Sequence, residues 1–168
     1  ILEAAIQQSR QSFETKLWDT KSDMYLDYDL TSQSSIHTDN ISQFLPLFAG
    51  IPDHKKAAHL ISKLETPAFW SDSGWGISTE SKSSESFDLE CYWRGPVWIN
   101  TNWMIIKGLE RYDRVDLAQR LAHETLDLVD QHGFFEYFNP DTGQGLGSDN
   151  FSWTAALVLD LIAKGYGK

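Results

Sequence analysis

The sequence predicts an all-α fold of about six helices, arranged as hairpins with long irregular loops. Apolar residues recur every three or four positions over six stretches, which is the spacing of a helix with one buried face. The chain has 168 residues, of which 41% are hydrophobic and 13% aromatic, so it can form one domain with a core. The expected helices cover residues 1–17, 39–49, 52–64, 96–112, 115–132 and 151–163.

The first three helices have recognisable ends. Residues 24–30 alternate between polar and apolar side chains after the first helix, which indicates a short strand or an extended segment. A polar linker then leads to the second helix, which Thr38 or Asp39 is expected to cap, Pro46 to kink and Gly50 to end. The third helix begins after Pro52 and Asp53 and turns apolar residues inward.

Inward positions of the second helix are Ile41, Phe44, Leu45 and Phe48, and those of the third are Ala57, Leu60, Ile61 and Leu64.

The last three helices follow a long irregular stretch, residues 66–91, where Trp70 and Trp75 are expected to edge a cleft and residues 81–86 to be solvated. Pro96 suits the first turn of the fourth helix, which is apolar nearly all round and therefore buried. Gly133 ends the fifth helix.

Two polar features of these helices need a structural explanation. Asn100 and Asn102 lie within the apolar fourth helix and need hydrogen-bond partners, either a polyhydroxyl ligand or nearby loops. Asn150 or Ser152 is expected to cap the last helix.

Charge and cysteine content exclude several classes of partner and cofactor. The net charge of −10 argues against nucleic acid and anionic membranes, and no apolar run approaches the roughly 20 residues of a membrane span. The single cysteine, Cys91, excludes an internal disulfide and fits a reducing, cytoplasmic setting. His54 and His59 lack metal spacing and the aspartates lack the EF-hand pattern, so we expect no metal and no cofactor.

The stretch between the last two helices holds an acid among aromatic residues. Glu136 lies between Phe135 and Tyr137, and residues 139–142 have the composition of a type I turn. Three glycines then leave the backbone able to approach a ligand closely. A sugar suits this setting, because rings stack on its C–H faces and carboxylates bind its hydroxyls. A partly buried glutamate with a local hydrogen bond remains an equally good interpretation.

A second stretch, Cys91–Asn100, reads CYWRGPVWIN and strengthens the interpretation as a sugar site. Together with FEYFNPDTGQGLG over residues 135–147 and FSWTAA over residues 151–156, it resembles the C-terminal part of inverting α-glycosidases of glycoside hydrolase family 63, including glucosylglycerate and mannosylglycerate hydrolases. The resemblance implies that residues 1–168 are the C-terminal portion of an (α/α)6 toroid, and so a partial toroid.

The resemblance also assigns roles to particular residues. It implies that Glu136 is the general base. Trp93 and Trp98 would stack on or frame the sugar, and Tyr92 and Arg94 would hydrogen-bond its hydroxyls or the aglycone. The remaining candidate substrate-binding residues are Gly95 and Trp153. For Arg94 a structural ion pair, and for Trp153 ordinary helix packing, are the alternatives.

No residue matches the general acid of the resembled family, and Asp29, Asp39 and Asp149 are not assigned to that role. The expected function is therefore the base-bearing fragment of an inverting α-glycoside hydrolase, acting on an oligosaccharide or a small α-glycoside. A non-catalytic carbohydrate-binding or structural helical module is the alternative. A lyase or epimerase is disfavoured, because His123 and His132 lack a catalytic setting. We expect the chain to need an upstream segment of the same protein or a self-associated dimer.

Overall fold

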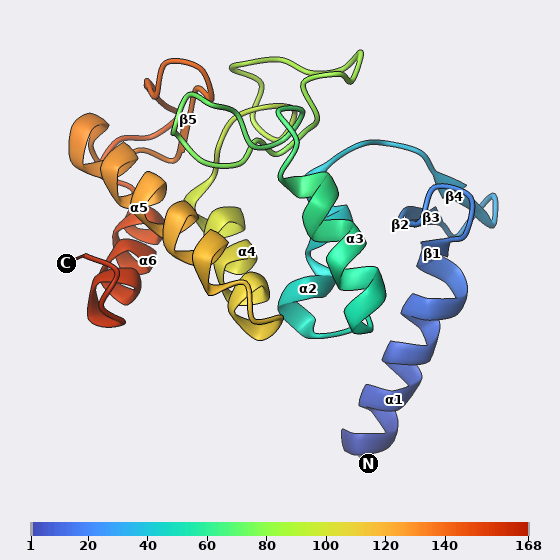
Figure 1. Cartoon of the computed structure of the whole chain (residues 1–168). Coiled ribbons are helices and arrows are strands. Elements are labelled where there is room, and N and C mark those ends of the chain that lie inside the picture. The colour runs from blue at the N-terminus through green and yellow to red at the C-terminus, as the bar shows by residue number, and fades with distance from the viewer. Residues whose placement is uncertain (1, 168) are drawn as a thin grey trace.

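The computed structural model describes residues 2–167, so Ile1, the expected start of the first helix, and Lys168 lie outside the described residues. This part of the chain is mostly helical, with three small two-stranded antiparallel sheets (Figure 1). The helices are α1 (Leu2–Ser12), the π-helix η1 (Phe13–Leu17), the 3-10 helix η2 (Ile41–Phe44), α2 (Pro46–Ala49), α3 (His54–Leu64), α4 (Ile99–Arg111), α5 (Val115–His132) and α6 (Ser152–Ala163). The strands are β1 (Trp18–Asp19), β2 (Met24–Tyr25), β3 (Asp27–Asp29), β4 (Ser34–Ile36), β5 (Tyr137–Phe138) and β6 (Gly145–Leu146). The expectation of six helices joined by long loops is confirmed in outline.

The N-terminal helix extends away from the rest of the chain (Figure 1). It continues through η1 as far as Leu17, as predicted, but α1 contains no buried residue. A hydrogen bond from the Arg10 Nη1 to the carbonyl of Gly50 ties it to the loop after α2, at 2.8 Å. The apolar side chains of Leu2 and Ile6 in α1 are left uncovered by the described residues, whereas Phe13 and Leu17 of η1 pack against the core.

Two small hairpins follow. β1 pairs with β2, and β3 pairs with β4, so the extended segment predicted over residues 24–30 is confirmed. The segment expected to be only a polar linker, residues 31–38, contains β4. Its pairing partner β3 is what orders it, because strands form through pairing that local composition does not encode.

The second predicted helix is split at Pro46, as its proline required. Asn40, rather than Thr38 or Asp39, caps η2, its side chain accepting from the backbone N–H of Ser42 at 2.9 Å. α2 begins at Pro46 and ends at Gly50, which adopts a left-handed conformation. Within the pair, Ile41 and Phe44 are buried as predicted, but Leu47 takes the inward position expected for Phe48, because the break at the proline rotates the helix.

The main core lies where α2, α3, α4 and α5 meet. All four predicted inward residues of α3 are buried, and Asp53 caps this helix through a hydrogen bond to the N–H of Lys56. α4 packs against α2, α5 and α6. At Gly108 of α4 an added Cβ would come 2.9 Å from the Cβ of Leu47, so a small residue permits the close approach of these two helices.

The fourth helix begins at Ile99, three residues later than predicted from Pro96. Val97 forms backbone hydrogen bonds with Phe138 in both directions, at 2.8 and 2.9 Å, and the Pro96 carbonyl accepts from Thr79. These pairings keep residues 96–98 extended. Pro96 therefore does not begin the helix; it lies in an extended segment that contacts distant loops.

The two long irregular segments, residues 65–98 and 133–151, lie at the same end of the helices (Figure 1). The prediction that Trp70 edges a cleft is wrong: its side chain is 2% exposed, and its Nε1 donates to Glu124 at 2.6 Å. Ser81, expected to be solvated, is also buried. The first segment thus belongs partly to the core, which explains how it stays ordered without regular structure.

The segment before α6 forms a hairpin that the sequence did not predict. β5 and β6 pair, and residues 139–144 connect them. The predicted turn at residues 139–142 lies inside this connection, with the Asn139 Oδ1 accepting from the N–H groups of Asp141 and Thr142. Phe151 occupies the N-cap of α6 and makes no side-chain capping bond, so the caps expected at Asn150 or Ser152 are wrong.

Candidate active site

The carboxylate of Glu136 is contacted by two segments that are far apart in the sequence. Its Oε1 accepts from the Tyr92 hydroxyl at 3.4 Å, and its Oε2 accepts from the backbone N–H of Ser148 at 3.3 Å. The Glu136 N–H in turn donates to the Ser148 carbonyl at 2.9 Å. The side chain is half-buried. A carboxylate held this way keeps further lone pairs for a water or a hydroxyl.

Three aromatic rings form a stack beside this carboxylate. The ring of Trp98 lies between that of Trp93, at 3.9 Å and 13°, and that of Tyr137, at 5.2 Å and 14°. Tyr92 meets Trp93, Trp98 and Tyr137 edge-on, with centroid distances of 5.6, 4.9 and 5.5 Å. Trp98 is 2% exposed, whereas Trp93 is 40% and Tyr92 46% exposed. Trp98 is thus the buried support of the stack, whereas Trp93 at its end and Tyr92 at its side are open to solvent.

The backbone of the YWRGPVW segment is constrained at two positions. Tyr92 has a φ of 39°, an unusual value for a bulky residue that persists only where the surroundings enforce it. The Trp98 Nε1 donates to the Tyr92 carbonyl at 2.8 Å, which helps to fix this conformation. Gly95 is buried with a φ of 152°, and an added Cβ would collide with the Asp88 carbonyl oxygen. The loop therefore packs closely around position 95 and requires a residue without a side chain there.

Arg94 is exposed and lies against the thiol of Cys91. Its Nε and Nη2 donate to the Cys91 Sγ at 3.3 and 3.0 Å, and this contact raises the pKa of Arg94 above its ordinary value. The structural ion pair considered for Arg94 is not formed within residues 2–167. Arg94 and Trp93 share a pocket of about 330 Å³ with residues 38 and 40–42, from the segment before α2, and with Thr79, Glu80 and Ser86.

Trp153 lies in the first turn of α6 and is 49% exposed. Two hydrogen bonds join this turn to the segment that carries the glutamate: Phe151 N–H to the Phe134 carbonyl at 2.8 Å, and the Thr154 Oγ1 to the Phe135 carbonyl at 2.7 Å. The start of α6 is therefore fixed beside Glu136, with a half-exposed indole on it.

The glycines of the hairpin serve packing rather than an open approach to ligand. A Cβ at Gly145 would strike the ring of Phe135, and one at Gly147 would come 2.7 Å from the Glu136 Oε2. Sequence reasoning missed Ser148 as part of this site, and it gave neither Gly147 nor Tyr137 the specific contact that the structure shows. The alternation of glycines was the available signal, but it did not say which side chains fill the space.

Electrostatic effects at the site follow from this arrangement. Burial raises the pKa of Tyr137, and the negative charge of Glu136 adds to that effect. Asp29, by contrast, belongs to a local turn, where its carboxylate accepts from the Ser32 hydroxyl and the Thr31 N–H. These bonds lower the pKa of Asp29, which keeps it ionised and makes it a poor proton donor.

The part of the chain that the structure describes contains no group of three or more His, Cys, Asp or Glu side chains able to hold a metal ion. Across the same residues, none of the helices combines the length and hydropathy that a membrane crossing requires.

Comparison with known proteins identifies the family. The profile of the mannosylglycerate hydrolase MGH1-like glycoside hydrolase domain matches residues 2–154. A mannosylglycerate hydrolase of Rubrobacter radiotolerans is 39% identical over 165 residues, covering 97% of this chain and 37% of that protein. A glucosylglycerate hydrolase of Mycolicibacterium hassiacum is 36% identical over 139 residues, covering 81% of this chain and 31% of that protein.

A solved structure agrees with these relatives. The family 63 mannosylglycerate hydrolase of Thermus thermophilus, in complex with Tris and D-glycerate, superposes with a TM-score of 0.85. It is 39% identical, and the match covers 94% of this chain and 37% of that chain. The present chain thus spans less than two fifths of the relatives that it matches. By sequence and by structure, it belongs to the family of mannosylglycerate hydrolase MGH1-like glycoside hydrolase domains.

Proposed function

We propose that the chain carries the general base and part of the sugar-binding cleft of an inverting α-glycoside hydrolase. The observation that supports this most strongly is the Glu136 carboxylate, held by Tyr92 and Ser148 beside a partly exposed aromatic stack. The named relatives act on mannosylglycerate and glucosylglycerate. A small α-glycoside with a glycerate aglycone is accordingly the substrate class that we propose.

In this proposal Glu136 removes a proton from the attacking water. An inverting glycosidase needs a second carboxyl group roughly 6.5–9.5 Å away, on the other side of the glycosidic bond, to protonate the leaving oxygen. Water then attacks the face of the sugar ring opposite the leaving group, and the product has the β configuration. The acid comes from the part of the catalytic domain that lies outside this chain.

Trp93 is the proposed platform for the sugar ring. Its ring is stacked by Trp98 on one side and 40% of the residue is exposed, so its free surface is available to the C–H face of a sugar. Trp98 stacks on the other face of the Trp93 ring and is itself stacked by Tyr137, so these two residues hold the plane of that ring. Tyr92 and Trp153 border the same site, and Gly95 shapes the loop. Arg94 supplies a cation for the carboxylate of a glycerate aglycone.

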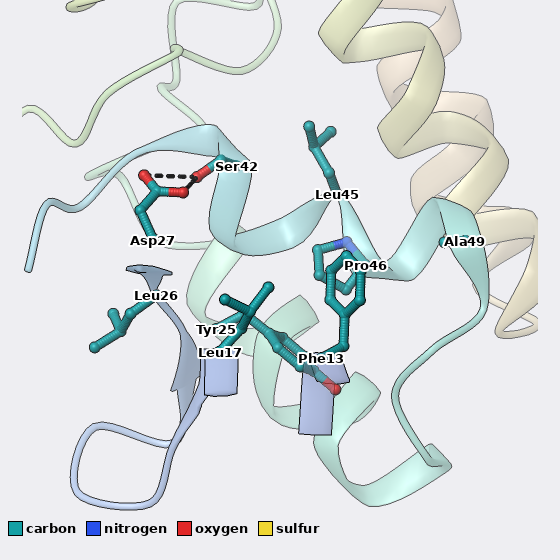
Figure 2. A pocket seen from close by; sticks show the side chains of 9 residues that line it. All are labelled: Phe13, Leu17, Tyr25, Leu26, Asp27, Ser42, Leu45, Pro46 and Ala49. Atoms are coloured by element: carbon teal, nitrogen blue, oxygen red, sulfur yellow. Dashed lines mark hydrogen bonds between the residues drawn. The ribbon is translucent and has the colours of Figure 1, made fainter. Parts of the chain in front are cut away.

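We further propose that the chain is the C-terminal portion of an (α/α)6 toroid. Uncovered apolar side chains at both ends support this: Leu2 is 74% and Ile6 46% exposed on α1, and Leu159 is 66% and Ile162 49% exposed on α6. An apolar groove of about 280 Å³ lies beside η1, which continues α1 (Figure 2). The preceding part of the same domain, or a second copy, would cover these surfaces.

Figure 2 shows how that groove is built. Phe13 and Leu17 of η1 and Tyr25 of β2 lie below the turn of η2 and α2, which contributes Leu45 and Pro46. At one edge the Ser42 hydroxyl lies within hydrogen-bonding distance of both carboxylate oxygens of Asp27, at 3.3 and 3.4 Å. The groove has no aromatic stack beside a free carboxylate, so we assign it to packing between parts of the domain rather than to sugar binding. Its remaining lining residues are Leu26 and Ala49.

A non-catalytic sugar-binding module is the second candidate, because no residue of the chain has been assigned the role of the acid. The substitution Glu136→Gln in the complete catalytic domain separates the two functions. We expect it to lower kcat on an α-mannosylglycerate or α-glucosylglycerate by about 10²–10⁴-fold, the usual contribution of a general base, while binding is retained. Turnover close to that of the unmodified protein would remove Glu136 from the mechanism. If the unmodified protein binds these compounds without hydrolysing them, the binding module is correct.

A further inference from the structure

The turn at Gly147 and Ser148 lies directly against Glu136. Ser148 contacts that residue twice through its backbone, once at the carboxylate and once at the N–H. An added Cβ on Gly147 would come 2.7 Å from the Glu136 Oε2 and 2.9 Å from the Glu136 Cβ. Gly147 also has a φ of 71°, in the left-handed region that L side chains disfavour. Both the conformation and the space therefore require a residue without a side chain.

The regular pairing of the hairpin ends just before this turn. Tyr137 is the last residue of β5 in this direction and lies opposite Leu146. Beyond that pair, the Glu136 N–H donates to the carbonyl of Ser148. The chain therefore turns at the left-handed Gly147, and this turn brings the backbone of Ser148 against Glu136.

We propose that Gly147 is a positioning residue for the general base, an inference that rests on the proposed role of Glu136. The turn at Gly147 directs the Ser148 N–H toward the carboxylate, and the missing Cβ of Gly147 leaves the space that the Oε2 occupies. With Tyr92 on the other oxygen, the carboxylate is fixed from two sides. An alanine at position 147 would push the carboxylate out of this space while leaving the aromatic stack in place.

The test compares Gly147→Ala with Gly74→Ala. Gly74 has a similar φ of 79° but no atom within 4 Å of an added Cβ, so it carries the same backbone strain without a collision. In the chain itself, the Ser148 amide proton is followed by NMR as pH is varied, since an N–H bonded to a carboxylate moves when that group ionises. Glu136→Gln identifies the contribution of Glu136 and separates it from that of the neighbouring Asp149.

We expect the Ser148 amide to respond to pH in the unmodified chain and in Gly74→Ala, and to lose the response in Gly147→Ala and Glu136→Gln. In the complete catalytic domain, Gly147→Ala should lower kcat by about 10–100-fold with KM within about twofold, whereas Gly74→Ala should change neither, because only the former displaces the base. An unchanged Ser148 response in Gly147→Ala, or equal kinetics for the two alanine variants, would overturn the inference. If Glu136→Gln is fully active while Gly147→Ala loses the amide response, the hydrogen-bond geometry is correct and the proposed function is what fails.

Discussion

Trp98 and Trp93 have different roles in the aromatic stack: we expect Trp98 to stabilise the fold and Trp93 to contact the ligand. Truncating each side chain in turn tests these two roles separately. Trp98 is 2% exposed, is stacked on both faces and donates a hydrogen bond to the Tyr92 carbonyl. Removing a buried tryptophan side chain costs about 3–5 kcal/mol. Trp93 is 40% exposed and stacked on one face, so its loss should cost about 1–2 kcal/mol.

The assay is urea unfolding of Trp98→Ala and Trp93→Ala followed by far-UV circular dichroism, which does not depend on the fluorescence of the removed residue. The difference in midpoint multiplied by the slope gives the change in unfolding free energy. Titration of the complete catalytic domain with an α-mannosylglycerate supplies the second quantity, and Trp93→Ala should weaken binding despite its small effect on stability. A Trp93→Ala variant that is less stable than Trp98→Ala would refute the assignment of Trp98 as the support.

Four other outcomes are expected. Tyr92→Phe removes one donor to the Glu136 carboxylate and should lower kcat by about 10–100-fold, since a hydrogen bond to a charged group contributes about 1.5–3 kcal/mol. Steady-state kinetics should show this loss with little change in KM. Asn102→Ala leaves the Ile77 N–H unpartnered and should cost about 2–3 kcal/mol in urea unfolding. The pKa of Asp160 is lowered by hydrogen bonds from Lys164 and Trp103, so the stabilisation lost in Asp160→Asn should be fully present above about pH 4 and disappear as acid protonates the carboxylate, which unfolding at several pH values would measure. The chain alone should sediment above the mass of a monomer because of its exposed apolar faces, and a stable monomer at micromolar concentration would contradict the partial toroid.

Helices α3 and α5 were predicted most accurately, because their caps and apolar spacing are local properties. Asp53 begins the former, Gly133 ends the latter, and the predicted inward residues of α3 are buried. The start of α4 was not predictable in the same way. Pro96 satisfies the rules for a helix start, but Val97 pairs with Phe138, some forty residues later, and that pairing outweighs the local preference.

In the candidate site, too, local motifs could be recognised in the sequence, but contacts between distant segments could not. The sequence motifs predicted Glu136, Trp93 and Trp98 as site residues, and the structure brings their segments together. Spacing alone could not tell which indole is buried, because that depends on Tyr137 stacking from another loop. Gly147 was noticed only as a flexible glycine. Its contact with the carboxylate depends on the left-handed turn that follows β6, and so on the pairing of β6 with β5, which local composition does not encode.

Chemical rescue of Glu136→Gln tests the central claim most directly. Azide needs no general base, so adding it to the variant in the complete catalytic domain should restore cleavage of an α-glycoside that carries a good leaving group. The account predicts a β-glycosyl azide, identified by the anomeric proton in NMR, because attack comes from the face on which Glu136 lies. An α-glycosyl azide, or a variant that hydrolyses the substrate at the unmodified rate without azide, would contradict the assignment of Glu136 as the base of an inverting enzyme.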